Sequence, residues 1–155
     1  MSHTWVAPSP PLASGSGANR VARATFIGHA VQSAFWAPDL GGYRLEAGID
    51  QVYASYGAWT SLGFLALSEV NSDAEWLDLA RANVAALDAR LHESDGGYAY
   101  RAYRCVDRVA KGCETGTAPT VVDHTRDTAA QAWAQHLHTA LGRQLSASET
   151  APSER

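Results

Sequence analysis

The side chains best suited to chemistry in this sequence lie close together, between residues 123 and 127. Asp123, His124, Arg126 and Asp127 all occur within this short stretch. Carboxylates can act as general acids and bases, and an imidazole beside charged neighbours can titrate near neutral pH. Carboxylates also suit the first turn of a helix, where they face the positive end of the helix dipole. A catalytic and a structural interpretation are therefore both open for the two aspartates, and a plain surface position is the alternative for His124.

Two cysteines, Cys105 and Cys113, lie in a stretch from 103 to 120 that has no helical periodicity. A disulfide between them would close about nine residues and stabilise the fold by roughly 2 to 3 kcal/mol in the chain-entropy model. Free thiols are the second interpretation. A zinc site would need two further ligands, and the histidines do not follow at the spacing of a compact zinc motif. We therefore predict a disulfide and no metal.

Two Gly-Gly-Tyr segments divide the sequence into the elements that must position these side chains. Gly41-Gly42-Tyr43-Arg44 and Asp95-Gly96-Gly97-Tyr98 are offset by 55 residues (96 minus 41). Consecutive glycines end a helix and permit a sharp turn. Apolar residues recur at intervals of three and four on both sides of each turn, which predicts helices over about 18–36, 49–70, 72–91 and 123–142. The chain is therefore predicted to contain two units of helix, turn and helix.

A second correspondence supports this duplication. Ala58-Trp59 matches Ala132-Trp133 at an offset of 74 (132 minus 58). The difference between the two offsets is about the length of the cysteine-containing loop, so the second unit would be the first unit with an insertion. We expect the two tryptophans to lie along a shared seam. The segments 43–46 and 98–101 have extended character and are predicted to pair, and the fold class is predicted to be all-α with short β segments at the turns.

A chain of 155 residues with 46% hydrophobic and 18% charged residues suits one globular domain. We expect a flexible leader over 1–17, a helical repeat domain over 18–145 and a disordered tail over 146–155. The net charge of -4 opposes nucleic-acid binding. No apolar stretch reaches the roughly 18 to 20 residues that span a bilayer. We therefore expect neither nucleic acid nor a membrane as a partner.

The first residues also bear on location in the cell. Residues 1–17 lack the basic and apolar regions of a secretory signal peptide, which favours the cytoplasm. A Cys105–Cys113 disulfide would require an oxidising compartment. An extracellular location is therefore the alternative if the chain is a fragment of a longer protein.

Helical hairpins with Gly-Gly-Tyr turns and aromatic-rich helices, such as Tyr56-Gly57-Ala58-Trp59, resemble the repeats of α/α-toroid carbohydrate-active proteins. This six-hairpin group includes N-acylglucosamine 2-epimerase-like proteins, unsaturated glucuronyl hydrolases and several glycoside hydrolase families. The resemblance covers about 18–142 and accounts for two hairpins only. It therefore implies a piece of a larger enzyme, a ring completed by identical chains, or another use of the same unit.

The resemblance also implies where a substrate would bind. In the toroid enzymes, aromatic side chains and carboxylates line the pocket near the starts of the inner helices, which correspond here to the helices predicted over 49–70 and 123–142. The resemblance implies that Asp123, His124 and Asp127 are catalytic, with carboxylates as general acid and base. The implied substrate-binding residues are Glu46, Asp50, Tyr98, Tyr100, Arg101 and Trp133. No cofactor is expected.

Two functional hypotheses follow. The first is a partial toroid domain of a carbohydrate-processing enzyme, which acts on a glycosidic bond or on a sugar stereocentre. The second is a non-catalytic helical module, whose exposed aromatic face serves self-association as a homo-oligomer or binding of another protein. The sequence contains no G-x-S-x-G, H-E-x-x-H, P-loop or G-x-G-x-x-G motif. The enzyme classes that carry those motifs are therefore disfavoured.

Overall fold

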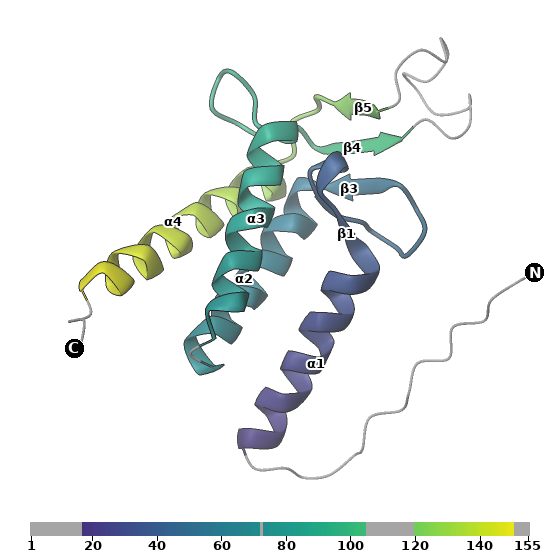
Figure 1. The fold of residues 1–155 in the computed structure, drawn as a ribbon. Helices are drawn as coiled ribbons and strands as arrows, with labels where there is room; N and C mark the ends of the chain where they lie inside the picture. The colour runs from purple at the N-terminus through teal and green to yellow at the C-terminus, as the bar shows by residue number, and fades with distance from the viewer. Residues whose placement is uncertain (1–16, 72, 105–119, 151–155) are drawn as a thin grey trace, which may run out of the picture.

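The computed structural model describes residues 17–71, 73–104 and 120–150. These residues form four α-helices that run from one end of the molecule toward a small sheet at the other (Figure 1). The helices are α1 (Gly17–Phe35), α2 (Ala54–Asn71), α3 (Ala74–Leu91) and α4 (Thr128–Thr150). The strands are β1 (Trp36–Ala37), β2 (Gly42–Tyr43), β3 (Gln51–Tyr53), β4 (Arg101–Arg104) and β5 (Thr120–Asp123), and a 3-10 helix, η1, spans Pro38–Leu40.

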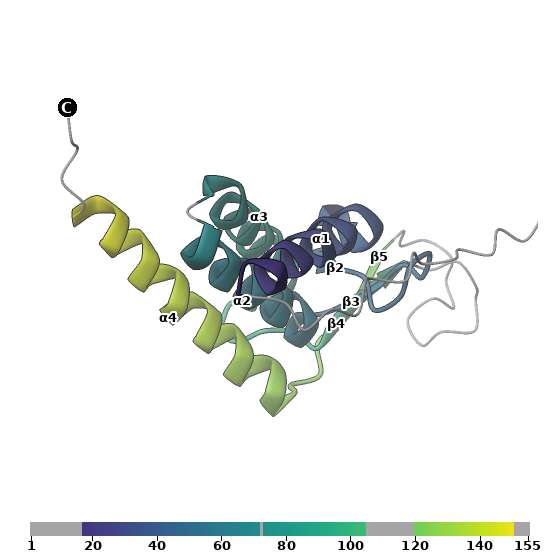
Figure 2. The ribbon, with the colours of Figure 1, turned by 90° about the horizontal axis from the view of Figure 1, so that it is seen from below.

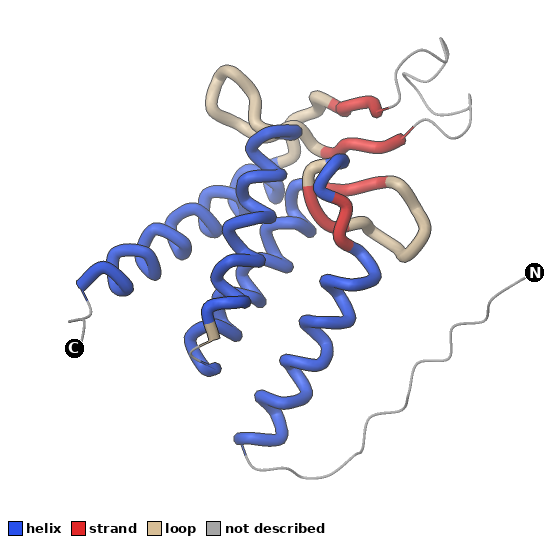
Figure 3. The backbone as a smooth tube through the Cα atoms, in the orientation of Figure 1, coloured by secondary structure: helices blue, strands red, loops and turns tan. Residues whose placement is uncertain are grey.

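The prediction of an all-α fold is wrong, because the fold is mixed. The described residues form two antiparallel sheets, one of β1 and β2 and one with the strand order β3-β4-β5 (Figure 3). The predicted pairing of 43–46 with 98–101 is also wrong. Val52 instead pairs with Ala102, which pairs with Val122 on its other side. Strands of two to four residues are too short to show an alternating pattern, and this sheet joins segments that are distant in the sequence.

α2 is the central helix, since it packs against α1, α3 and α4. Seen from below, α4 runs along one side of α2 and α1 lies on another (Figure 2). α2 is therefore buried on several faces. Gly57 allows α3 to approach closely, because a Cβ atom there would lie 2.8 Å from Leu87 Cδ1. The same explanation fails for Gly63, where a Cβ atom would meet no atom within 4 Å.

The two Gly-Gly-Tyr turns share two features. Gly41 and Gly96 both adopt positive φ angles, 99° and 89°, which favour glycine. The tyrosine after each turn is buried, and its hydroxyl donates a hydrogen bond back to the preceding helix. Tyr43 donates to Gln32 of α1, and Tyr98 donates to Asp88 of α3. The predicted duplication thus has a structural counterpart at the turns.

Several predicted boundaries shift. α2 begins at Ala54 because 51–53 form β3, and α4 begins at Thr128 because 120–123 form β5. The side chain of Asp127, not that of Asp123, caps α4 by accepting a hydrogen bond from the Ala130 N–H at 2.8 Å. α4 then continues past 142, where its end was predicted, so the predicted domain limit at 145 falls inside a helix. None of the helices in the described ranges is long and apolar enough to cross a membrane.

Some expectations fall on other parts of the chain. The Cys105–Cys113 disulfide, residues 1–16 of the expected leader and 151–155 of the expected tail lie outside the described residues.

Candidate functional site

Five aromatic side chains form a continuous series of ring contacts. We call Tyr100, Tyr53, Tyr56, Trp59 and Trp133 the aromatic row. Neighbouring ring centroids along the row lie 5.0, 5.5, 6.0 and 5.2 Å apart, and each contact is edge-to-face. Two of the five rings are well exposed, Tyr56 at 40% and Trp59 at 51%. Exposed aromatic rings in a contiguous group are characteristic of a binding surface.

The row crosses from the sheet to the helices. Tyr53 is the last residue of β3, and Tyr56 and Trp59 follow at intervals of three on the first turns of α2, so the three side chains lie along one side of the chain. Trp133 reaches the row from α4. Its contact with Trp59 confirms the predicted seam between the two helices.

Arg101 marks one end of the row. Its guanidinium carbon lies 5.9 Å from the centre of the Tyr53 ring and 5.7 Å from that of Tyr100, within the range of a cation–π interaction. Its Nε atom donates a hydrogen bond to Asp123 Oδ2 at 3.1 Å. Three residues predicted to bind substrate, Tyr100, Arg101 and Trp133, therefore lie in or beside the row.

Each predicted catalytic residue makes a contact that could serve the fold alone. Asp123 lies in β5, and hydrogen bonds from Thr125, followed by the interaction with Arg101, lower the pKa of its carboxyl group. His124 is exposed, and its Nδ1 atom lies 2.6 Å from Glu93 Oε1. Asp127 is the N-cap of α4. Its charge also helps to raise the pKa of Tyr100, after burial and the neighbouring Tyr53, so this carboxylate acts on one end of the row.

The two remaining predicted acids lie on the loop before β3. Glu46 is exposed, and its backbone carbonyl accepts a hydrogen bond from the Ile49 N–H at 3.2 Å. Asp50 is partly buried and accepts a hydrogen bond from Arg44 Nε at 3.0 Å. This ion pair joins the loop to the residue after β2. No contact between either acid and the aromatic row is found in the described part of the chain.

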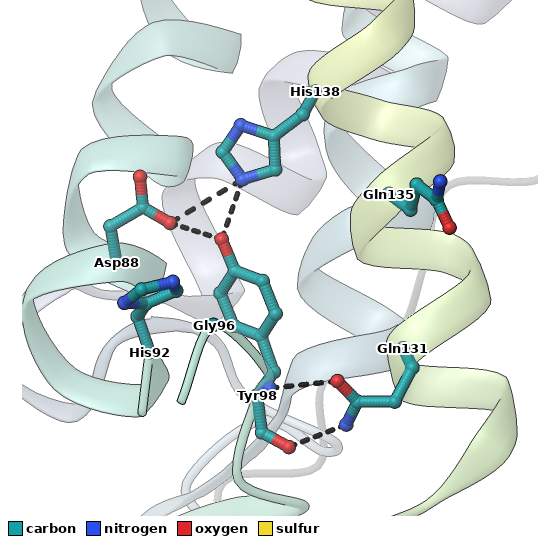
Figure 4. Close-up of a pocket in the computed structure, with 7 residues that line it drawn as sticks. All are labelled: Asp88, His92, Gly96, Tyr98, Gln131, Gln135 and His138. Atoms are coloured by element: carbon teal, nitrogen blue, oxygen red, sulfur yellow. Dashed lines mark hydrogen bonds and ion pairs between the residues drawn. The ribbon is translucent and has the colours of Figure 1, made fainter. Parts of the chain in front are cut away.

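A separate pocket of about 540 Å³ lies between α3, α4 and the second Gly-Gly-Tyr turn (Figure 4). We call it the Tyr98 pocket. Tyr98 is its only lining residue that was predicted as a site residue. The pocket is lined by Asp88, His92, Gly96, Tyr98, Gln131, Gln135 and His138.

Tyr98 is held at both ends. The side-chain amide of Gln131 accepts a hydrogen bond from the Tyr98 N–H at 2.8 Å and donates one to the Tyr98 carbonyl at 2.6 Å. The Tyr98 hydroxyl contacts Asp88 and lies 2.5 Å from His138 Nε2, and Nε2 lies 3.4 Å from Asp88 Oδ1 (Figure 4). The position of the ring is therefore fixed by two helices.

The protons of this group can be assigned from its geometry. Burial, then the hydrogen bond to Asp88 and the charge of that residue, raise the pKa of Tyr98 well above its usual value, so the phenol keeps its proton. Because a hydroxyl has one proton and donates it to Asp88, His138 Nε2 must be the donor toward the Tyr98 oxygen. His138 therefore carries a proton on Nε2, and its Nδ1 atom is available for another partner.

Comparison with protein-family models, curated proteins and solved structures finds no match for this chain. The toroid resemblance therefore stays a prediction from the sequence. No group of three or more His, Cys, Asp or Glu side chains suited to a metal ion occurs among the residues whose positions are described.

Reasoning from the sequence missed several of these residues. Tyr53 and Tyr56 were not predicted as site residues, although their spacing of three from each other and from Trp59 is a signal for one shared face. Asp88 was not predicted as a site residue, and it lies on the exposed side of α3. No sequence signal connects Asp88 to His138, because their proximity depends on how α3 and α4 pack.

Proposed function

We propose that this chain binds carbohydrate along the aromatic row, as part of a carbohydrate-processing enzyme of the glycoside hydrolase or sugar epimerase type. The observation that carries the proposal is the continuous contact of five aromatic rings, of which Tyr56 and Trp59 are well exposed. The C–H faces of a sugar ring are apolar and carry partial positive charge. They therefore complement the negative face of an aromatic ring.

The surroundings of the row favour a neutral ligand. Arg101 is the cation at its end, and its charge is already balanced by Asp123 at 3.1 Å. Arg101 can still donate hydrogen bonds to sugar hydroxyls, and Asp123 can still accept hydrogen bonds from them. Since the rings follow one another over several contacts, an oligosaccharide would cover more of the row than a monosaccharide.

The binding test uses the full chain and a panel of neutral oligosaccharides measured by isothermal titration calorimetry. Trp59→Ala removes the most exposed ring of the row and is expected to weaken binding about tenfold or more, a loss of ~1.4 kcal/mol. Phe26→Ala is the matched control, because Phe26 is a comparably exposed ring, at 59%, on α1. Equal affinity of the Trp59→Ala variant and the parent, or no binding by any oligosaccharide, would refute the proposal.

The catalytic half of the proposal rests on Asp127, the predicted catalytic acid that acts electrostatically on the row. Asp127→Asn keeps an N-cap of equal quality, so α4 should stay folded while the carboxylate is lost. We expect the variant to bind the oligosaccharide and to turn it over about 100-fold more slowly than the parent, the low end for loss of a general acid or base. Unchanged turnover in a folded Asp127→Asn variant would exclude this residue from catalysis.

A further inference from the structure

The Tyr98 pocket contains polar groups that the fold itself does not use. Among the residues that the structure describes, none makes a hydrogen bond with Asp88 Oδ2, with either ring nitrogen of His92, with the side-chain amide of Gln135 or with His138 Nδ1. All four side chains line the same pocket (Figure 4). Convergent polar groups around a concave surface are the usual composition of a small-molecule site.

The pocket is also preorganised. Gln131 fixes the backbone of Tyr98 on two sides, and the Tyr98 hydroxyl joins Asp88 to His138. Gly96 forms part of the wall at a φ of 89°, and the space beside its Cα is open, because a Cβ atom there would meet no atom within 4 Å. A ligand would therefore bind beside side chains that are already held in position, and the entropy cost of ordering them on binding would be small.

The charges of the pocket select against anions, because Asp88 is a carboxylate and no lining side chain is a permanent cation. One oxygen of Asp88 already accepts a hydrogen bond from the Tyr98 hydroxyl and lies 3.4 Å from His138 Nε2, so an amine would find only Oδ2 free. The remaining free groups are a mixture of donors and acceptors on His92, Gln135 and His138, and none is a permanent cation. A molecule with several hydroxyl groups, each of which donates and accepts, matches this mixture better than a carboxylate, a phosphate or an amine does.

We propose that the Tyr98 pocket binds one neutral polyhydroxylated molecule of monosaccharide size, with Asp88, His92, Gln135 and His138 as its hydrogen-bonding groups. The volume of about 540 Å³ falls in the range of small-molecule sites. Residues 131, 135 and 138 recur at intervals of four and three on one flank of α4, whereas Trp133 faces the other flank. The pocket is therefore a site separate from the aromatic row.

The test follows the ring Cε1–H resonances of the six histidines by NMR while the full chain is titrated with neutral monosaccharides and linear polyols. We expect saturable shifts of the His92 and His138 resonances and none of His29, which lies on α1. Glucuronate and glucosamine serve as the anionic and cationic probes, and an oligosaccharide tests whether the terminal unit of a glycan occupies the pocket. Absence of saturable shifts with every neutral probe, or saturable shifts with charged probes alone, would overturn the proposal.

Two variants test the assigned groups while keeping the hydrogen bonds that hold Tyr98. Gln135→Ala leaves the contacts of Tyr98 in place, and His92→Ala removes one edge-to-face ring contact with Tyr98, at 5.2 Å between centroids. His92→Ala and Gln135→Ala change exposed side chains outside the Gln131 and Asp88 contacts, and each should weaken binding about fivefold, as expected for one hydrogen bond. His29→Ala is the control and should leave binding unchanged. Wild-type affinity in both pocket variants would overturn the proposal. Trp59→Ala should leave the pocket shifts intact, which keeps a failure of this proposal distinct from a failure of the aromatic row.

Discussion

At the scale of single residues, the two tyrosines that follow the Gly-Gly turns explain much of the local order. Tyr43 and Tyr98 are both almost fully buried, with exposures of 2% and 6%. Burial raises the pKa of each phenol well above its ordinary value, and Asp88 adds to this effect at Tyr98. Because the neutral phenol is the form that the fold accepts, the two residues contribute stability below the unfolded-state pKa of about 10. That stability is lost as the pH rises through the raised values.

The raised pKa values predict that two tyrosines ionise at higher pH than the others. In an alkaline titration followed by phenolate absorbance, Tyr43 and Tyr98 should ionise only when the chain unfolds, at a pH above about 10. Tyr98→Phe should remove one late-ionising phenol and should lower the free energy of unfolding at neutral pH by about 1 kcal/mol, because the hydrogen bond to Asp88 is lost. Reversible ionisation of every tyrosine near the ordinary value would show that these two rings are not buried as described.

At the scale of secondary-structure elements, the helices could be predicted and the strands could not. The segment 74–91 has a clear apolar stripe, and α3 matches it closely. Gln51-Val52-Tyr53 continues directly into a helical pattern, so the sequence gives no sign that β3 ends where α2 begins. The strand that pairs with β3, β4, lies about 50 residues further along the chain, and β5, which pairs with β4, lies about 70 residues further along. Only tertiary packing brings the three strands together.

The two glycines inside α2 provide a matched pair of substitutions. Gly63→Ala places a methyl group in open space and should raise the free energy of unfolding by about 0.5 to 1 kcal/mol, because alanine favours the helix. Gly57→Ala places the same group against Leu87, which is buried at 1% exposure, and should lower it by about 1 to 2 kcal/mol. Urea unfolding measures both. Equal effects of the two substitutions would mean that α3 does not approach α2 at Gly57.

At the scale of the whole molecule, the aromatic row and the Tyr98 pocket lie on opposite flanks of α4. The Trp59–Trp133 contact could be expected from the repeat, because the two residues occupy corresponding positions. The complete aromatic row could not be expected from the sequence, since Tyr100 contacts Tyr53 only because β3 pairs with β4. The Tyr98 pocket depends on the packing of α3 against α4. Of its lining residues, only Gly96 and Tyr98 were marked by the sequence, as parts of a Gly-Gly-Tyr turn.

The most direct measurement of the central claim observes the indole N–H resonances of the five tryptophans while a neutral oligosaccharide is added. The aromatic row contains Trp59 and Trp133, whereas Trp76 is fully buried in the core and lies outside the row. If carbohydrate binds along the row, the Trp59 and Trp133 resonances will shift and saturate together, and the Trp76 resonance will stay in place. Binding that leaves Trp59 and Trp133 unshifted would contradict the account.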